Sequence, residues 1–364
     1  MRFGALSVSL ALLLFAACGR SQSSAPPWET DNPIRPLAAA PLGMELYFAE
    51  AKEPPVPARV RLGRWLFFDT RLSGDSTISC ASCHRPENAF SEPSSVSTGI
   101  RGQKGIRKAP SLVNLAVQPR LMTSRPGEDA PHFFFWDGRA NSLEDQVSGP
   151  LENAIEMGNS HASMIQTLSS VSGYKPYFKE AFGTEEVTKE RVERAIADYE
   201  RTRMSGNSPY DRWRFARQRD AVSAQAKLGH DLFFDRARCS QCHSGSNFTD
   251  GTFYSLGVGW DPRTNAFKDQ GRFVVTEMSR DRGAFKVPGL REVSKRAPYM
   301  HDGSIATLRD VVELYNRGGI RNPNVSPRIV PLGLSTTEVD ALVAFLRALE
   351  GEGYQDRPPT AFPK

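Results

Sequence analysis

Cys80-Ala81-Ser82-Cys83-His84 and Cys239-Ser240-Gln241-Cys242-His243 are the two stretches of this sequence that decide its fold. In the Cys-x-x-Cys-His form, two thiols can bond the vinyl groups of a haem while the adjacent histidine ligates the iron from one face. A zinc site or two disulfides are the structural alternatives, but a histidine directly after each pair fits both poorly in an exported protein. The sequence therefore predicts two covalently bound c-type haems, with His84 and His243 as iron ligands.

A matching segment precedes each cysteine pair. Residues 61–69 and 227–235 share a Leu-Gly pair and a Leu-Phe-Phe-Asp ending. Each copy is typical of a short helix with clustered apolar residues, followed by a loop, so the chain contains an internal repeat. Each half is therefore expected to build the same unit around one haem.

Two more helices are expected, and they complete the predicted architecture. One runs from about Thr188 to Met204, and the other starts at Ser335, which Glu338 helps to cap, and ends near Gly351. Strand patterning is sparse. We predict a mainly α protein of two cytochrome c-like domains with long loops, each enclosing one haem. The predicted domains are 46–217 and 218–352, followed by a tail over 353–364.

Length and charge limit the class of protein. The 364 residues are enough for two domains, and the 29 glycines and 26 prolines favour long loops around a bulky cofactor. The formal net charge is +5, with basic residues scattered along the chain rather than gathered in a run. This pattern argues against a nucleic-acid partner.

The N-terminus is typical of an export signal. An apolar run from Ala5 to Ala17 ends in small residues before Cys18, and it is too short for a comfortable membrane span. Residues 1–18 are therefore expected to be a lipoprotein signal, with Cys18 lipidated and 19–45 as a tether; an ordinary cleavage site near Cys18 is the alternative. The sequence predicts a periplasmic protein that meets a membrane only through this lipid.

The chain resembles the bacterial di-haem cytochrome c peroxidase and MauG family along nearly its whole mature length. The matching segments are 62–69, 79–84, 135–140 (Phe-Trp-Asp-Gly-Arg-Ala) and 297–301 (Ala-Pro-Tyr-Met-His). The resemblance implies that the first haem reacts with hydrogen peroxide and that the second relays or stores oxidising equivalents.

The resemblance also implies roles for three residues. Glu156 and Gln146 match a distal pair at the first haem, where a carboxylate can move a proton between the two peroxide oxygens and an amide can orient them. Trp136 matches a tryptophan between the haems. Without the motifs, Glu156 would be interpreted as a surface charge and Trp136 as a core residue.

Two positions depart from the donor-linked peroxidases of the family. Ile100 stands where many members carry a distal histidine, so we expect a first haem that is open to peroxide in the resting ferric state. Tyr315 stands where those members have a methionine ligand to the second iron, and MauG has tyrosine there. A phenolate stabilises oxidised iron, whereas a thioether raises the potential. The alternative is that Tyr315 is a packed helix residue and that Met300 or Met278 is the ligand.

The family's calcium site is also altered. Lys108 stands where an asparagine oxygen is expected, and Arg296 lies in the loop that supplies carbonyl groups. Lysine cannot ligate calcium, but its ammonium group can replace the ion's positive charge, so the enzyme is expected to be calcium-independent. Of the other histidines, His301 is expected near a haem propionate, whereas His132, His161 and His230 are expected to have no ligand role.

Three functions are compatible with these residues. The first is peroxide reduction with electrons from a small cytochrome or copper protein. The second is MauG-like oxidation of a Trp or Tyr side chain on a partner protein. The third is plain electron transfer, which makes no use of an open iron beside an acid and an amide. Peroxidase chemistry of the first two kinds is the prediction, and the sequence does not identify the electron donor.

Overall fold

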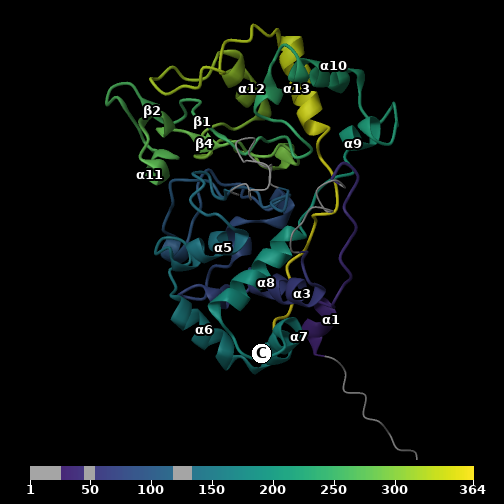
Figure 1. Cartoon of the computed structure of the whole chain (residues 1–364), viewed down its shortest axis with the longest axis vertical. Helices are drawn as coiled ribbons and strands as arrows, with labels where there is room; N and C mark the ends of the chain where they lie inside the picture. The colour runs from purple at the N-terminus through teal and green to yellow at the C-terminus, as the bar shows by residue number, and fades with distance from the viewer. Residues whose placement is uncertain (1–25, 45–53, 118–132) are drawn as a thin grey trace, which may run out of the picture.

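The computed structural model describes residues 26–44, 54–117 and 133–364 (Figure 1). The predicted signal, Cys18 and the first part of the predicted tether lie outside these ranges. In the described ranges, no helix is long and apolar enough to cross a membrane.

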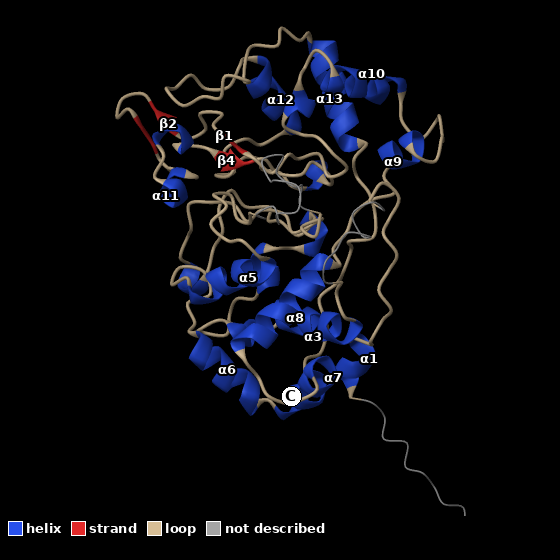
Figure 2. Ribbon diagram, in the orientation of Figure 1, coloured by secondary structure: helices blue, strands red, loops and turns tan. Residues whose placement is uncertain are grey.

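The described chain is mainly helical, as predicted. Its helices are α1 (Pro27–Asp31), α3 (Pro57–Phe68), α4 (Cys80–Cys83), α5 (Leu143–Glu152), α6 (His161–Ser170), α7 (Lys175–Phe182), α8 (Lys189–Arg201), α9 (Pro209–Arg214), α10 (Ala224–Phe234), α11 (Phe273–Thr276), α12 (Leu308–Asn316) and α13 (Thr336–Arg347). The named strands are two residues long and form two antiparallel pairs: β1 (Phe253–Tyr254) with β4 (Phe285–Lys286), and β2 (Trp260–Asp261) with β3 (Ala266–Phe267). Figure 2 shows helices towards both ends of the molecule and mostly loops between them.

Each half of the chain is built on one close helix crossing. A Cβ atom on Gly63 of α3 would lie 1.8 Å from the carbonyl oxygen of Ala195 on α8, and one on Gly229 of α10 would lie 1.9 Å from that of Ala341 on α13. The two repeated Leu-Gly pairs therefore occupy the same structural position, where only glycine lets the two helix backbones approach so closely. This shared crossing is the physical basis of the internal repeat.

Two separate hydrophobic cores surround these crossings. The first core includes Trp65, Phe67, Phe90 and Tyr199, and the second includes Phe233, Phe248 and Phe345. We call these the first and second units; they lie at opposite ends of the long axis in Figure 1. The boundary at 217/218 stays a prediction.

The two helices expected from sequence are present, with different ends. The helix expected from Thr188 is α8, capped by the Thr188 side chain. The capping box of Ser335 and Glu338 is formed as predicted. However, α13 ends at Arg347 instead of near Gly351, because Gly351 is held in a loop by the side chain of Glu292, which accepts its N–H.

Residues outside the two predicted domains are packed rather than free. In the predicted tether, the Trp28 ring nitrogen donates to the Tyr177 hydroxyl at 3.1 Å, and Asn32 is buried. In the predicted tail, Tyr354 belongs to the first core and Asp356 bonds to Arg64 at 3.0 Å. Residues 26–44 and 353–364 therefore both contact the first unit.

We predict that Gly63→Ala destabilises the protein by about 1–3 kcal/mol, the usual cost of overpacking, because the new methyl group would push α3 and α8 apart. Replacing glycine by alanine in an exposed helix would instead stabilise the protein. Denaturant unfolding measures the difference. Gly105→Ala is the control, because its Cβ would meet no atom closer than 3.8 Å. Equal stability of the Gly63 variant and the wild type would contradict the close crossing.

Candidate functional site

The structure contains one large cavity beside each Cys-x-x-Cys-His segment. The first cavity, of about 260 Å³, is lined by Cys80, Cys83 and His84. The second, of about 210 Å³, is lined by Cys239, Cys242 and His243. The four thiols are free rather than paired. Within the described ranges, no cluster of three or more His, Cys, Asp or Glu residues could hold a metal ion by itself.

His84 and His243 are held in the same way. The ring Nδ1 atom of His84 lies 3.0 Å from the carbonyl oxygen of Phe90, and that of His243 lies 3.0 Å from the carbonyl oxygen of Phe248. A carbonyl oxygen can only accept a hydrogen bond, so each Nδ1 carries the proton and each Nε2 keeps its lone pair for a metal. Burial lowers the pKa of His84 to about 4 and also lowers that of His243, so both rings are neutral.

These observations fit a haem in each cavity. Each cavity offers two unpaired thiols for the haem edge and one neutral, oriented imidazole for the iron. Each histidine bonds to a carbonyl group in its own loop, so the two units support a haem site independently of each other.

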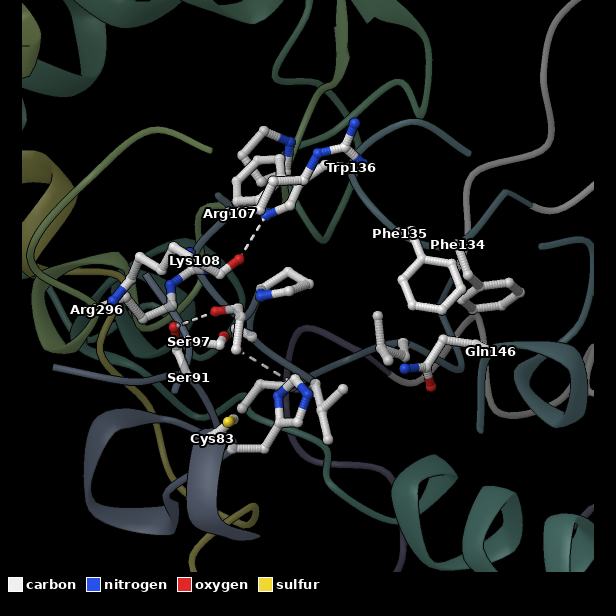
Figure 3. A pocket seen from close by; sticks show the side chains of 18 of the residues that line it. Cys83, Ser91, Ser97, Arg107, Lys108, Phe134, Phe135, Trp136, Gln146 and Arg296 are labelled. Atoms are coloured by element: carbon white, nitrogen blue, oxygen red, sulfur yellow. Dashed lines mark hydrogen bonds between the residues drawn. The ribbon is translucent and has the colours of Figure 1, made fainter. Parts of the chain in front are cut away.

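Glu156 and Gln146 both line the first cavity. Gln146 lies on α5 and is 7% exposed, and its side-chain oxygen is buried without a hydrogen bond. Glu156 lies in the loop after α5, where Asn153 Nδ2 donates to its Oε1 at 2.8 Å. Burial raises the pKa of Glu156, opposed by the charge of Arg139 and the bond from Asn153. Figure 3 shows Gln146 with Phe134 and Phe135 on one side of this cavity.

Ile100 supports the wall of the first cavity from outside. Its side chain is buried, its N–H donates to the carbonyl oxygen of Glu156 at 2.8 Å, and it packs where a Cβ on Gly158 would fall. Of the described residues that line the first cavity, His84 is the one histidine. His132 lies outside the described residues.

Trp136 lies in the wall that the two cavities share. It lines both of them, together with Lys286, Tyr299 and Met300. Its ring N–H donates to the carbonyl oxygen of Lys108 at 2.8 Å, which fixes the orientation of the indole (Figure 3). An aromatic ring held between two haem cavities can carry charge from one to the other.

Tyr315 lines the second cavity from α12. Burial raises its pKa well above the ordinary value, and its hydroxyl makes no hydrogen bond within the described part of the chain. Of the alternative ligands, Met300 lines the cavities, whereas Met278 is 48% exposed and lines neither. The structure thus brings Tyr315 and His243 to one cavity and leaves Met278 outside.

Lys108 and Arg296 lie on one side of the first cavity (Figure 3). The Lys108 ammonium group donates to the carbonyl oxygens of Glu92 and, at 3.2 Å, Ser94. Arg296 donates to the carbonyl oxygen of Gly289 at 2.6 Å. Burial lowers the pKa of Lys108 to about 8 and that of Arg296 to about 10.

The other described histidines divide as follows. His301 lines the second cavity and stacks on Phe285, with ring centroids 3.6 Å apart. His161 bonds to Glu152 at 2.7 Å, and His230 packs among aromatic rings of the second unit; neither lines a cavity.

Several ionisable residues of the cavities were not found from sequence, Glu200 and Lys286 among them. Glu200 lines the first cavity and Lys286 lines both. The Lys286 ammonium group donates to the carbonyl oxygen of Phe133 at 2.6 Å, and burial lowers its pKa to about 8. Lys286 lies far along the sequence from both Cys-x-x-Cys-His segments, so no sequence motif pointed to it.

The repeated crossing and the two matched cavities define a two-haem protein. Comparison with known proteins identifies its family. Residues 57–220 match the family model described as "Di-haem cytochrome c peroxidase". The chain is 37% identical to methylamine utilization protein MauG of Methylorubrum extorquens over 300 residues, which cover 82% of this chain and 80% of that protein. It is 32% identical to cytochrome c551 peroxidase of Nitrosomonas europaea over 340 residues, covering 93% and 90% of the two chains.

A solved structure agrees with these relatives. The crystal structure of a MauG-like protein associated with microbial copper homeostasis superposes with a TM-score of 0.74 at 30% identity, covering 86% of this chain and 97% of that one. The chain therefore belongs to the di-haem cytochrome c peroxidase and MauG family. It is a peroxidase with haem as its cofactor.

Proposed function

We propose that this protein reduces hydrogen peroxide at the first cavity and shares the oxidising equivalents with the second through Trp136. The observation that carries the proposal is the pairing of Glu156 and Gln146 in the first cavity, where His84 is the one lining histidine of the described chain. When bound through Cys80 and Cys83, a c-type haem supplies the iron at which peroxide is reduced.

The protein groups divide the work around that iron. Glu156, poised by burial and by Asn153, takes a proton from one peroxide oxygen and returns it to the other, so that water can leave. The free side-chain oxygen of Gln146 orients the peroxide or an ordered water molecule. Trp136, fixed by its bond to Lys108, provides the path to the second cavity.

The resting spectrum tests whether the first haem is open. We expect the fully ferric protein to show a high-spin signal from the first haem, because Ile100 supplies no sixth ligand. Low-temperature EPR measures it, with cyanide as the control that converts an open site to low spin. A wholly low-spin ferric protein would contradict the proposal.

The electron source separates two versions of this function. A small cytochrome or copper protein as donor corresponds to the peroxidases among the relatives. Oxidation of a Trp or Tyr on a partner protein corresponds to MauG, and Tyr315 in the second cavity favours it. Peroxide consumption measured with a reduced small cytochrome, and separately with candidate substrate proteins, distinguishes the two. Plain electron transfer is the weakest candidate, because it leaves Glu156 and Gln146 without a role.

The protein is proposed to work in the periplasm, held to a membrane by a lipid on Cys18. The apolar run before Cys18 supports this location. Mass spectrometry of the mature N-terminus tests it, since the proposal requires a diacylated Cys18 as first residue.

Calcium is not expected to be required. The Lys108 ammonium group donates to two carbonyl oxygens, so a positive charge already occupies the position proposed for the ion. Peroxidase activity should therefore be unchanged after treatment with EGTA and dialysis. Loss of activity that added calcium restores would show that Lys108 does not replace the ion.

A further inference from the structure

Glu200 is a buried carboxylate that the proposed peroxide chemistry does not use. It lies near the end of α8, is 3% exposed and lines the first cavity. Its Oε2 atom is buried without a hydrogen-bond partner. Ionising a buried carboxyl group that has no partner is costly, so an unpaired one that lines a cofactor cavity is a candidate for a role in the chemistry there.

The charges around Glu200 leave it uncompensated. Glu200 interacts electrostatically with Cys80 of α4 and Glu144 of α5, and neither of these residues carries a positive charge. Arg201 is the one nearby cation that opposes the shift, but its guanidinium group bonds to Glu144 at 2.9 Å and Asp198 at 3.1 Å. The arginines of the packed helix α3 pair with other carboxylates: Arg59 with Asp198, Arg61 with Glu180 and Arg64 with Asp356. Burial, against the smaller effect of Arg201, raises the pKa of Glu200 to about 8.

The internal repeat supplies a comparison within the same molecule. Ala195 and Ala341 are the two crossing residues, and Glu200 and Leu346 follow them at the same spacing. Leu346 lines the second cavity, as Glu200 lines the first. The first unit therefore places an ionisable group where the second places a hydrocarbon side chain, so packing alone does not explain Glu200.

We propose that Glu200 is the proton acceptor coupled to the first haem: its carboxylate binds one proton when that haem gains one electron, and the carboxylic acid releases the proton when the haem loses it. The electron comes from the redox donor and the proton from solvent, so the net charge of the buried site is unchanged by the transfer. The inference rests on a haem bound at Cys80 and Cys83, and it is the same for either electron source.

The physical reason is the low dielectric of the cavity. A charge added to the haem interacts strongly with a carboxylate a short distance away when water and counter-charges are excluded. Protonating Glu200 removes that repulsion and makes the electron easier to accept. Reduction of peroxide to two water molecules consumes two protons and two electrons, so linked uptake of both suits this site.

Redox titration of the purified di-haem protein at a series of pH values tests the proposal. In the wild type, the midpoint potential of the first haem should fall as the pH rises through a window near pH 8, approaching one proton per electron at the steepest point. Glu200→Gln keeps the shape but cannot ionise, and it should flatten the curve in that window. Haem propionates titrate in both proteins, so the difference between the curves isolates Glu200.

Infrared difference spectra and two further variants complete the test. Reduction should produce a protonated-carboxyl band in the wild type that Glu200→Gln lacks. The control Glu144→Gln should keep the pH dependence but move it to lower pH, since Glu144 raises the pKa of Glu200. Glu200→Leu, which copies the second unit, should behave as Glu200→Gln does. The same pH dependence in wild type and Glu200→Gln, with both haems present in the optical spectrum, would overturn the role of Glu200 alone. Absence of the first haem from the wild type would instead overturn its assignment.

Discussion

Glu156→Gln should lower the rate of reaction with peroxide by about 10²–10⁴-fold, the usual contribution of a positioned general acid–base group. The amide keeps the size and can still accept from Asn153 Nδ2, which lies 2.8 Å from Glu156 Oε1, but it cannot take up the peroxide proton. Stopped-flow mixing of the ferric protein with peroxide measures the rate. Glu152→Gln, an exposed carboxylate in the same segment, is the control and should react as the wild type does. An unchanged rate in Glu156→Gln would show that another group moves the proton.

The same residue predicts a pH dependence. Burial raises the pKa of Glu156, and the carboxylate is the form that accepts a proton. The rate with peroxide should therefore rise with pH through this raised pKa and be lost as the pH falls below it. In Glu156→Gln this rise should be absent, and its persistence would assign it to another group.

Tyr315→Met should raise the midpoint potential of the second haem on the order of 0.1 V or more, because axial ligands cover a range of roughly 0.8 V and a thioether favours reduced iron. The substituted side chain would remain on α12 at the second cavity, where the Tyr315 hydroxyl makes no competing hydrogen bond. Redox titration followed by optical spectra measures the potential.

Tyr254→Phe is the matched control for the second haem. Tyr254 also lines that cavity, but its hydroxyl donates to Asp250 at 3.1 Å, so removing it should leave the iron's ligands unchanged. If Tyr315→Met leaves the potential unaltered, Tyr315 is a packing residue and Met300 becomes the candidate ligand.

Much of the fold could be predicted because the decisive signals are local. A Cys-x-x-Cys-His segment contains its own haem-binding groups, and the repeated Leu-Gly pair marks the helix crossing in each unit. The Ser335 capping box involves residues three positions apart and is formed as predicted. The end of α13 could not be predicted in the same way, since Gly351 bonds to Glu292, which is far away in the sequence.

The parts that could not be predicted depend on contacts between distant segments. Asp356 and Tyr354 lie in a polar, proline-containing stretch typical of a tail, yet they pair with Arg64 and join the first core. Glu200 follows the amphipathic part of α8, where a charged residue is normally interpreted as solvated. It is buried and lines the first cavity, a placement that no local pattern reveals.

We propose that the first haem is open and that the second, with Tyr315, stores an oxidising equivalent. The most direct test is to add hydrogen peroxide to the fully ferric protein and follow it by low-temperature EPR and near-infrared absorption. We predict that the high-spin signal disappears at once and that a long-lived near-infrared band appears. If neither change occurs until one haem has first been reduced, the claim is contradicted, and the protein is a reductively activated peroxidase supplied by a small redox protein.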